Sequence, residues 1–151
     1  MSTTTTYTTT FSIAVVSWQI ASGNNPSTTL LYNDESVVAF DDISPAAEYH
    51  FLVIPKKHIK NINEFKKDDV ELVKKMKEIG LRIISEKLGE SKSSITSTEY
   101  LIGFVSPPFN TVPHVHMHVF TKPITCWWPR SMTFGNWIFK NVDEFIDEID
   151  N

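Results

Sequence analysis

The fold is decided by the stretch His114-Val115-His116-Met117-His118-Val119-Phe120, in which histidine and apolar residues alternate strictly. Successive side chains of a β-strand point to opposite faces, so this alternation predicts a strand over 113–120 with all three imidazoles on one face. Val115, Met117 and Val119 are then expected to face the core. Imidazole has no special preference for strands, so three histidines on one face indicate a functional role.

Two kinds of chemistry use such a face, and the residues alone do not decide between them. Neutral imidazole is a common zinc ligand, and two histidines at positions i and i+2 can reach one ion. Alternatively, one imidazole attacks an electrophile while its neighbours fix its tautomer and move a proton. A zinc site needs further ligands, and the other two histidines, His50 and His58, lie far back in the sequence.

Four further strands are expected on the amino-terminal side of the histidine stretch. Residues 30–32 and 36–40 flank a polar turn and predict a hairpin. The β-forming run 49–54 ends at Pro55, which cannot donate to a strand ladder. Residues 100–105 predict another strand, so that five strands are expected in total.

The main helix is expected over 68–88, where apolar residues recur at steps of three and four. Acidic residues at its start and Gly89 at its end agree with this assignment. Apolar residues at helical spacing above an acidic face predict a short terminal helix over 137–149. A short apolar segment at 15–21 precedes a turn and suggests an opening helix.

The composition describes one globular domain of 151 residues, 41% of them hydrophobic. Residues 1–10 include seven threonines, and we expect this lead-in to be disordered. The rest, 11–151, is expected to form a single domain with an extension beyond the histidine stretch. The single cysteine, Cys126, excludes an intramolecular disulfide framework, and an intracellular protein in the cytoplasm or nucleus is expected.

The charge distribution argues against two classes of partner. The 14 basic and 18 acidic residues give a net charge of −4, with five acids and no base in residues 143–151. A surface that binds nucleic acid needs clustered lysine and arginine, so we expect no nucleic-acid partner. The apolar stretch 11–16 is too short to span a membrane, so no membrane partner is expected either.

At this point the sequence resembles a known family. The His-x-His-x-His run, together with the upstream block from Phe40 to Ile59, resembles the Hint branch of the histidine triad superfamily in order and spacing over about residues 15–121. The resemblance implies an α+β fold, with a mainly antiparallel five-stranded sheet, one long helix and short terminal helices. It also implies homodimers whose sheets join.

The resemblance implies an enzyme that cleaves the P–N bond of adenosine 5′-monophosphoramidates through a covalent nucleotidyl-histidine intermediate. His116, the middle histidine, corresponds to the family's nucleophile. His118 would contact the phosphate, and His114 would orient His116, with His50 on the neighbouring strand as the partner of His114. This scheme requires no metal and no cofactor.

The same resemblance implies a binding site for a purine nucleotide. Asp42 would accept hydrogen bonds from the ribose hydroxyls, since a carboxylate accepts two at once. Apolar residues would line the base pocket, namely Phe40, Ile43 and Ile20. Thr111 stands where the family has a Ser or Thr that donates to the phosphate or the leaving group, and the neighbouring Asn110 is included in the site.

The chain departs from the family pattern in the loop before the histidines. Two prolines within residues 106–111 remove amide donors from the loop that approaches the phosphates, so the phosphate site must be built differently. A nucleotide-binding scaffold with little turnover therefore stays open. Asn110 replaces the glutamine of the dinucleoside polyphosphate hydrolases, which weakens that alternative. One cysteine excludes the zinc finger of the aprataxin-like branch.

Trp127, Trp128 and Pro129 follow the histidines at the distance where Hint proteins carry a Trp-Pro pair that reaches the partner subunit's site. The same residues could instead pack in the core, since tryptophan is usually buried. The sequence does not decide between these two roles.

Overall fold

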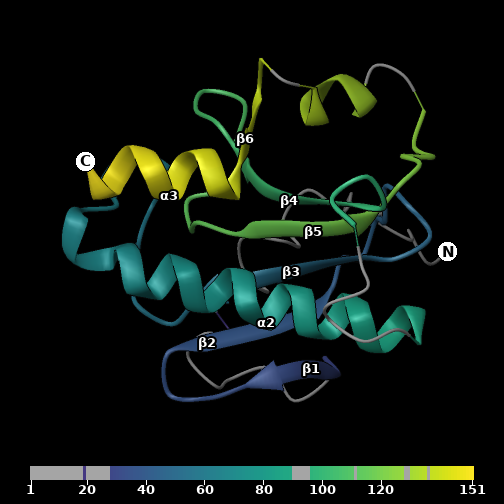
Figure 1. Ribbon diagram of the computed structural model, residues 1–151, viewed down its shortest axis with the longest axis horizontal. Helices are drawn as coiled ribbons and strands as arrows, with labels where there is room; N and C mark the ends of the chain where they lie inside the picture. The colour runs from purple at the N-terminus through teal and green to yellow at the C-terminus, as the bar shows by residue number, and fades with distance from the viewer. Residues whose placement is uncertain (1–18, 20–27, 90–95, 111, 128–129, 136) are drawn as a thin grey trace, which may run out of the picture.

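The computed structural model describes residues 19, 28–89, 96–110, 112–127, 130–135 and 137–151 (Figure 1). Its strands are β1 (Leu30–Asn33), β2 (Val37–Asp41), β3 (His50–Pro55), β4 (Tyr100–Val105), β5 (Met117–Thr121) and β6 (Phe139–Asn141). Its helices are α2 (Val70–Leu88) and α3 (Val142–Asp150), with 3-10 turns η2 (Ile62–Glu64), η3 (Lys67–Asp69) and η4 (Arg130–Phe134). The described chain is thus an α+β structure, as expected.

The strands form one antiparallel sheet of six strands in the order β1-β2-β3-β5-β4-β6. β3 and β5 lie at its centre, and their register pairs His50 with Phe120 and Leu52 with His118. Side chains two apart share a face, so His50 and His118 lie diagonally across from each other on the same face of the sheet.

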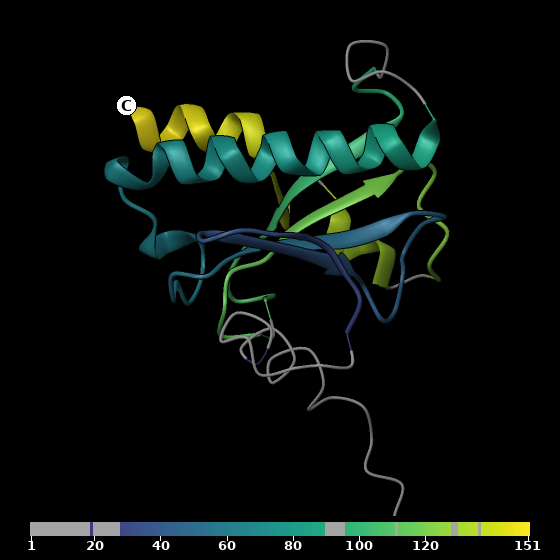
Figure 2. The same ribbon diagram turned by 90° about the horizontal axis from the view of Figure 1, so that it is seen from below.

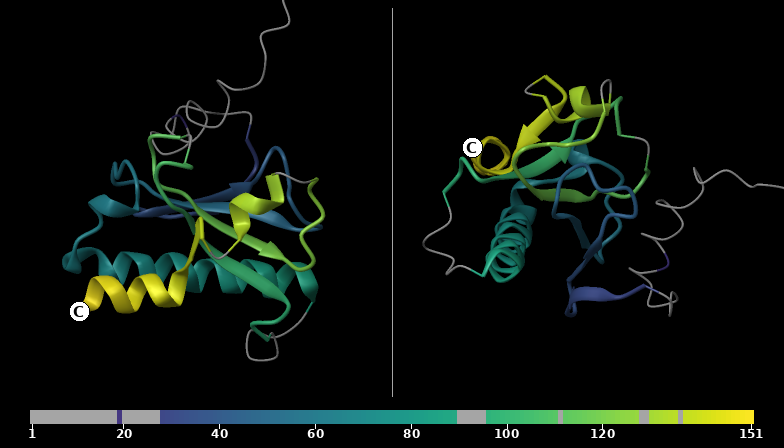
Figure 3. Two further views of the ribbon diagram at one scale, coloured as in Figure 1. Left: turned by 90° about the horizontal axis from the view of Figure 1, so that it is seen from above. Right: turned by 90° about the vertical axis from the view of Figure 1, so that its right-hand side faces the viewer.

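Helices α2 and α3 cover the other face of the sheet. Figure 2 shows both helices on this face, and Figure 3 shows the same layering from two further sides. The main core lies between these layers and includes Val115, Met117 and Val119, which confirms their expected inward orientation. None of the helices in the described part of the chain has the length and apolar character that a membrane span requires.

The histidine strand is shorter than expected, because β5 begins at Met117 rather than at Pro113. Its partner β3 ends at Pro55, and beyond this point the amide of Val115 donates to the carbonyl of Ile59, 2.7 Å away. His114 and His116 therefore precede the strand.

The sheet has a sixth strand that the sequence did not predict. β6 pairs with β4, and Gly103 makes this approach possible, since a Cβ at position 103 would lie 2.1 Å from the carbonyl oxygen of Lys140. The strand occupies the start of the expected terminal helix. That helix instead begins at Val142, where the side chain of Asn141 accepts a hydrogen bond from the amide of Asp143.

Several expectations fall on residues outside the described part of the chain. These residues include the threonine-rich lead-in 1–10 and, apart from Gln19, the apolar segment 15–21. The boundary at residue 11 and the opening helix therefore stay predictions.

Candidate active site

The histidines lie on the sheet face that α2 and α3 leave uncovered, beside a cavity of about 230 Å³. The cavity is lined by residues from β2, β3, β4, β5 and the segments that follow them. They are Asp42, Leu52, Val105, Phe109, Asn110, Val112, His116, His118, Arg130, Thr133 and Phe134. Two of the three triad histidines thus face one concave space.

His50 and His118 form a hydrogen-bonded pair whose direction is set by the main chain. The amide of Ala46 donates to Nδ1 of His50 over 2.9 Å, so this nitrogen is an acceptor and Nε2 carries the hydrogen of the neutral ring. Nε2 of His50 lies 2.9 Å from Nδ1 of His118 and donates to it. His118 consequently carries its own hydrogen on Nε2.

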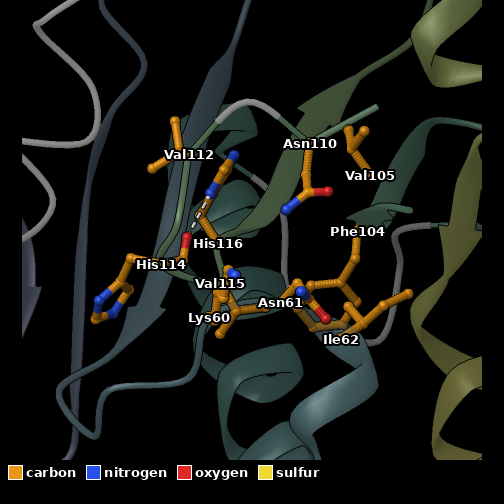
Figure 4. A pocket seen from close by; sticks show the side chains of 10 residues that line it. All are labelled: Lys60, Asn61, Ile62, Phe104, Val105, Asn110, Val112, His114, Val115 and His116. Atoms are coloured by element: carbon orange, nitrogen blue, oxygen red, sulfur yellow. Dashed lines mark hydrogen bonds between the residues drawn. The ribbon is translucent and has the colours of Figure 1, made fainter. Parts of the chain in front are cut away.

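A backbone carbonyl fixes the tautomer of His116. Its Nδ1 donates to the carbonyl oxygen of His114 over 2.9 Å, drawn as the dashed line in Figure 4. Its Nε2 then keeps a free lone pair, as a nucleophile requires. The rings of His116 and His118 meet edge to face, with centroids 4.9 Å apart. A nitrogen with a lone pair and an N–H donor therefore lie side by side.

His114 acts differently from the expectation, because its carbonyl rather than its ring holds His116. Its ring donates from Nε2 to the carbonyl of Pro55 over 2.8 Å and contacts the ring of His58. The expected pairing of His114 with His50 is wrong, since His50 bonds to His118. His114 lines a smaller neighbouring pocket together with His116, but it does not line the cavity that His116 and His118 share.

Burial keeps the site histidines neutral at physiological pH. It lowers the pKa of His50 to about 4, although the neighbouring Asp42 carboxylate acts in the opposite direction. Burial likewise lowers the pKa of His116 and of His114, and brings the pKa of His118 well below its usual value. The guanidinium of Arg130 further lowers the pKa of His50 and His118.

Asp42, His50 and His118 form a buried cluster whose ligand atoms lie within 4.8 Å of one another. A metal there would need a lone pair on Nε2 of His50, yet this nitrogen carries a hydrogen because Nδ1 accepts from the amide of Ala46. The donor set therefore suits a hydrogen-bond relay better than a metal site. One Asp42 oxygen accepts from the amide of Ser44, and the other lies 3.6 Å from Nε2 of His50.

The residues expected to bind the nucleotide are brought together only in part. Asp42 and Asn110 line the cavity. Phe40 is buried against Leu52, one of the lining residues, whereas the Ile43 residue is 56% exposed and does not line the cavity. Ile20 and Thr111 lie outside the described residues, so their roles stay predictions.

The sequence did not point to the C-terminal segment, defined as residues 130–135 and 137–141, of which the first part lines the cavity. Arg130, Thr133 and Phe134 line the cavity from η4. The Phe134 ring contacts the rings of His50 and His118, with centroids 6.0 and 5.5 Å apart. The available signal was Arg130, one of only two arginines in the chain, in an otherwise aromatic stretch.

Trp127 does not pack in the core, since the residue is 74% exposed. It is also absent from the residues that line the cavity. Trp128 and Pro129 lie outside the described part of the chain. A role for Trp127 at a partner subunit's site therefore stays a prediction.

Comparison with known proteins identifies the class. The family model for the C-terminal binding domain of the scavenger mRNA decapping enzyme matches residues 14–130. A solved HIT family hydrolase from Legionella pneumophila Philadelphia 1 superposes with a TM-score of 0.60 at 29% identity, covering 76% of this chain and 97% of that one. The fold and the histidine site thus define a member of the histidine triad superfamily.

Within that superfamily the chain belongs to the Hint branch. It is 42% identical over 107 residues to the bifunctional adenosine 5′-phosphosulfate phosphorylase/adenylylsulfatase HINT4 of Arabidopsis thaliana, covering 69% of this chain and 68% of the relative. It is 31% identical over 142 residues to the adenosine 5′-monophosphoramidase HINT3 of Xenopus tropicalis, covering 92% and 89%.

A more distant structure shares the fold alone. The aprataxin ortholog Hnt3, solved in complex with DNA, superposes with a TM-score of 0.65 at 17% identity. The match covers 89% of this chain and 74% of that one. At this identity it carries no functional argument for the present chain.

Proposed function

We propose that this chain hydrolyses adenosine 5′-monophosphoramidates, cleaving the P–N bond and releasing AMP, with His116 as the nucleophile. As a Hint protein, the chain is a hydrolase of the nucleotide phosphoramidase type that acts on small nucleotides. One observation carries the assignment of the nucleophile. The bond from Nδ1 of His116 to the carbonyl of His114 leaves Nε2 with the lone pair beside the cavity.

The chemistry proceeds in two displacements at phosphorus. Nε2 of His116 attacks the phosphorus, the P–N bond to the amine breaks, and the amine leaves with the bonding electrons and takes up a proton from solvent. The Nε2–H of His118 donates to a phosphoryl oxygen as negative charge develops on it. Water then attacks the adenylyl-His116 intermediate, loses a proton to solvent, and releases AMP while the electron pair returns to Nε2.

The positions of the lining residues support a nucleotide bound along the cavity. The oxygen of Asp42 that faces His50 would accept from the ribose hydroxyls, while the other is held by Ser44. Phe40 and Ile43 would contact the purine, with Ile20 beside them. Asn110 and Thr111 would approach the phosphate or the leaving group.

Three further properties remain proposals. A homodimer rests on the resemblance, a cytoplasmic or nuclear location rests on the single cysteine, and the absence of nucleic-acid and membrane partners rests on the charge distribution and the short apolar stretch 11–16. The β4 edge at Gly103–Val105 is already paired with β6. A homodimer in which the sheets join would therefore need an edge other than this part of β4. The molecular mass in solution, measured by light scattering, tests the dimer directly.

A trapping experiment tests the proposed nucleophile. The wild-type chain is incubated with an adenylyl phosphoramidate labelled on the phosphate, quenched without acid and digested, and we expect the label on His116. His116→Asn should take up no label and release no AMP. Equal turnover by wild type and His116→Asn would overturn the assignment. Tight AMP binding with no cleavage of phosphoramidates or dinucleoside polyphosphates would indicate a binding scaffold instead.

A further inference from the structure

Arg130 is the feature of the cavity that the proposed phosphoramidase chemistry leaves unused. Its guanidinium donates from Nη2 to the carbonyl oxygen of Ser44 and from Nη1 to the Ser44 hydroxyl. A guanidinium has five N–H donors, so these two bonds leave three for a ligand. The side chain is thus anchored at the cavity wall with donors to spare.

The charge inventory of the cavity gives Arg130 a distinct role. Among the described residues that line the cavity, Arg130 is the only lysine or arginine and Asp42 the only acid. Burial lowers the pKa of His116 and His118, so neither imidazole is a cation near neutral pH. The permanent positive charge that faces the substrate therefore comes from Arg130.

These protonation states matter for the leaving group. An amine must take up a proton as it departs, and the neighbouring imidazoles are neutral, which makes them weak proton donors. Sulfate, phosphate and carboxylate leave as anions and need no proton. They need positive charge instead, and a guanidinium binds such groups through two parallel hydrogen bonds.

We propose that Arg130 is a specificity-determining residue, which binds an anionic leaving group and so favours mixed anhydrides such as adenylyl sulfate over substrates with an amine leaving group. This inference rests on the proposed nucleophilic function of His116. HINT4, the relative with 42% identity, carries the name adenylylsulfatase, which agrees with this substrate class.

The step balances without a further reactant. Nε2 of His116 attacks the phosphorus of the adenylyl group, and the P–O bond to the sulfate breaks. The sulfate departs with the bonding electrons as a dianion paired with Arg130. The adenylyl-His116 that remains is the same intermediate as in phosphoramidate cleavage, and water resolves it to AMP.

The test compares two substrates in three variants. We expect Arg130→Met to lower kcat/KM for adenylyl sulfate by about 10- to 100-fold, the usual effect of losing a charged hydrogen-bond partner. The kcat/KM for adenosine 5′-phosphoramidate should fall by a smaller factor, so that the ratio of kcat/KM for adenylyl sulfate to kcat/KM for the phosphoramidate falls by about threefold or more. Arg130→Lys, which keeps the charge without the planar fork, should recover part of the loss.

Arg82→Met serves as the matched control. Arg82 is the other arginine of the chain, lies on α2, contacts the ring of Tyr32 and does not line the cavity. Arg82→Met should leave the ratio of the two kcat/KM values unchanged, and thermal unfolding of both variants checks that they are folded.

The outcomes separate the inference from the proposed function. An equal loss on both substrates would place Arg130 at the common phosphate and overturn the inference while leaving His116 as the nucleophile. No loss on either substrate would overturn it too. If wild type and His116→Asn cleave adenylyl phosphoramidate equally, the proposed function itself fails.

Discussion

The central strand pair β3–β5 and the C-terminal segment meet at one cavity but are built in different ways. The strand pair carries His50 and His118, and main-chain groups set the hydrogen bonds of its imidazoles. The C-terminal segment adds no imidazole and instead places the Phe134 ring over those two rings and Arg130 at the wall.

The difference shows that the two regions contribute different properties to the site. The main chain around the strand pair fixes which nitrogens carry hydrogens, and therefore which atom attacks. The C-terminal segment controls the surroundings, because it helps to exclude water from the imidazoles and supplies the positive charge. Substitutions in the two regions should consequently change different measurable properties of the protein.

The largest effect is expected from the strand side, in His116→Asn. Loss of the nucleophile should lower kcat for an adenylyl phosphoramidate by about 10,000-fold or more, in line with nucleophile removal in other enzymes. Steady-state kinetics measures this, with His58→Asn as the histidine control because His58 does not line the cavity. A loss in His58→Asn as large as that in His116→Asn would contradict the assignment.

The second effect tests how the C-terminal segment is attached. In Gly103→Ala the new Cβ meets the Lys140 carbonyl at 2.1 Å, so β6 must move away from β4. We expect a loss of about 3 kcal/mol in the free energy of unfolding and a fall in kcat/KM of about tenfold or more.

Gly80→Ala is the matched control for this prediction. Its new Cβ would lie 2.9 Å from Cγ2 of Val119, a side-chain atom, and alanine raises helix propensity by about 1 kcal/mol. Urea unfolding of Gly80→Ala should differ from wild type by about 1 kcal/mol or less. A Gly80→Ala variant less stable than Gly103→Ala would contradict the close pairing of β4 and β6.

The third effect is a loss of stability in acid. The pKa of His50 is about 4 in the folded chain against an ordinary 6.5, so the unfolded chain binds more protons between these values. The stabilisation is complete above pH 6.5 and falls as the pH decreases towards 4. His50 alone should account for about 2 kcal/mol between pH 7.5 and pH 5.0.

Urea unfolding at pH 7.5 and pH 5.0 measures this loss in wild type and in His50→Gln. The variant should show a shallower pH dependence because it lacks the buried imidazole. Identical pH dependence in both chains would mean that His50 is not kept neutral by the fold.

The smallest effect tests whether the C-terminal segment shields the imidazoles from water. Phe134→Leu should admit water to the imidazoles and raise the pKa of His118 towards its ordinary value, since burial is the first cause of its lowered value. NMR titration of the ring protons measures this. Phe145→Leu, a buried phenylalanine on the helix side of the sheet, should leave that pKa unchanged.

Much of the strand pair and the long helix could be predicted because periodicity reports local geometry. The alternation at 114–120 identified Val115, Met117 and Val119 as core residues, and the helical spacing at 68–88 agrees with α2. Periodicity did not show that the histidine strand begins only at Met117, nor that the His114 ring bonds to the carbonyl of Pro55 rather than to His50.

The C-terminal segment could not be predicted because its structure depends on distant contacts. β6 has three residues, too few for an alternation to stand out, and it forms where Gly103 leaves room for Lys140. Arg130 is held at the cavity wall by its hydrogen bond to the carbonyl of Ser44, which lies 86 positions earlier in the chain. Neither the contact of Gly103 with Lys140 nor the contact of Arg130 with Ser44 can be inferred from a single sequence.

The hydrogen bond from the amide of Ala46 to His50 implies that one essential part of the site has no side chain of its own. This peptide group determines which ring nitrogen carries the hydrogen in His50 and, through His50, in His118. It does so without moving either ring. An alanine scan would pass over Ala46, since the residue is already alanine. Only a substitution that removes the amide hydrogen, such as Ala46→Pro, or an ester in place of this peptide bond would reveal its contribution.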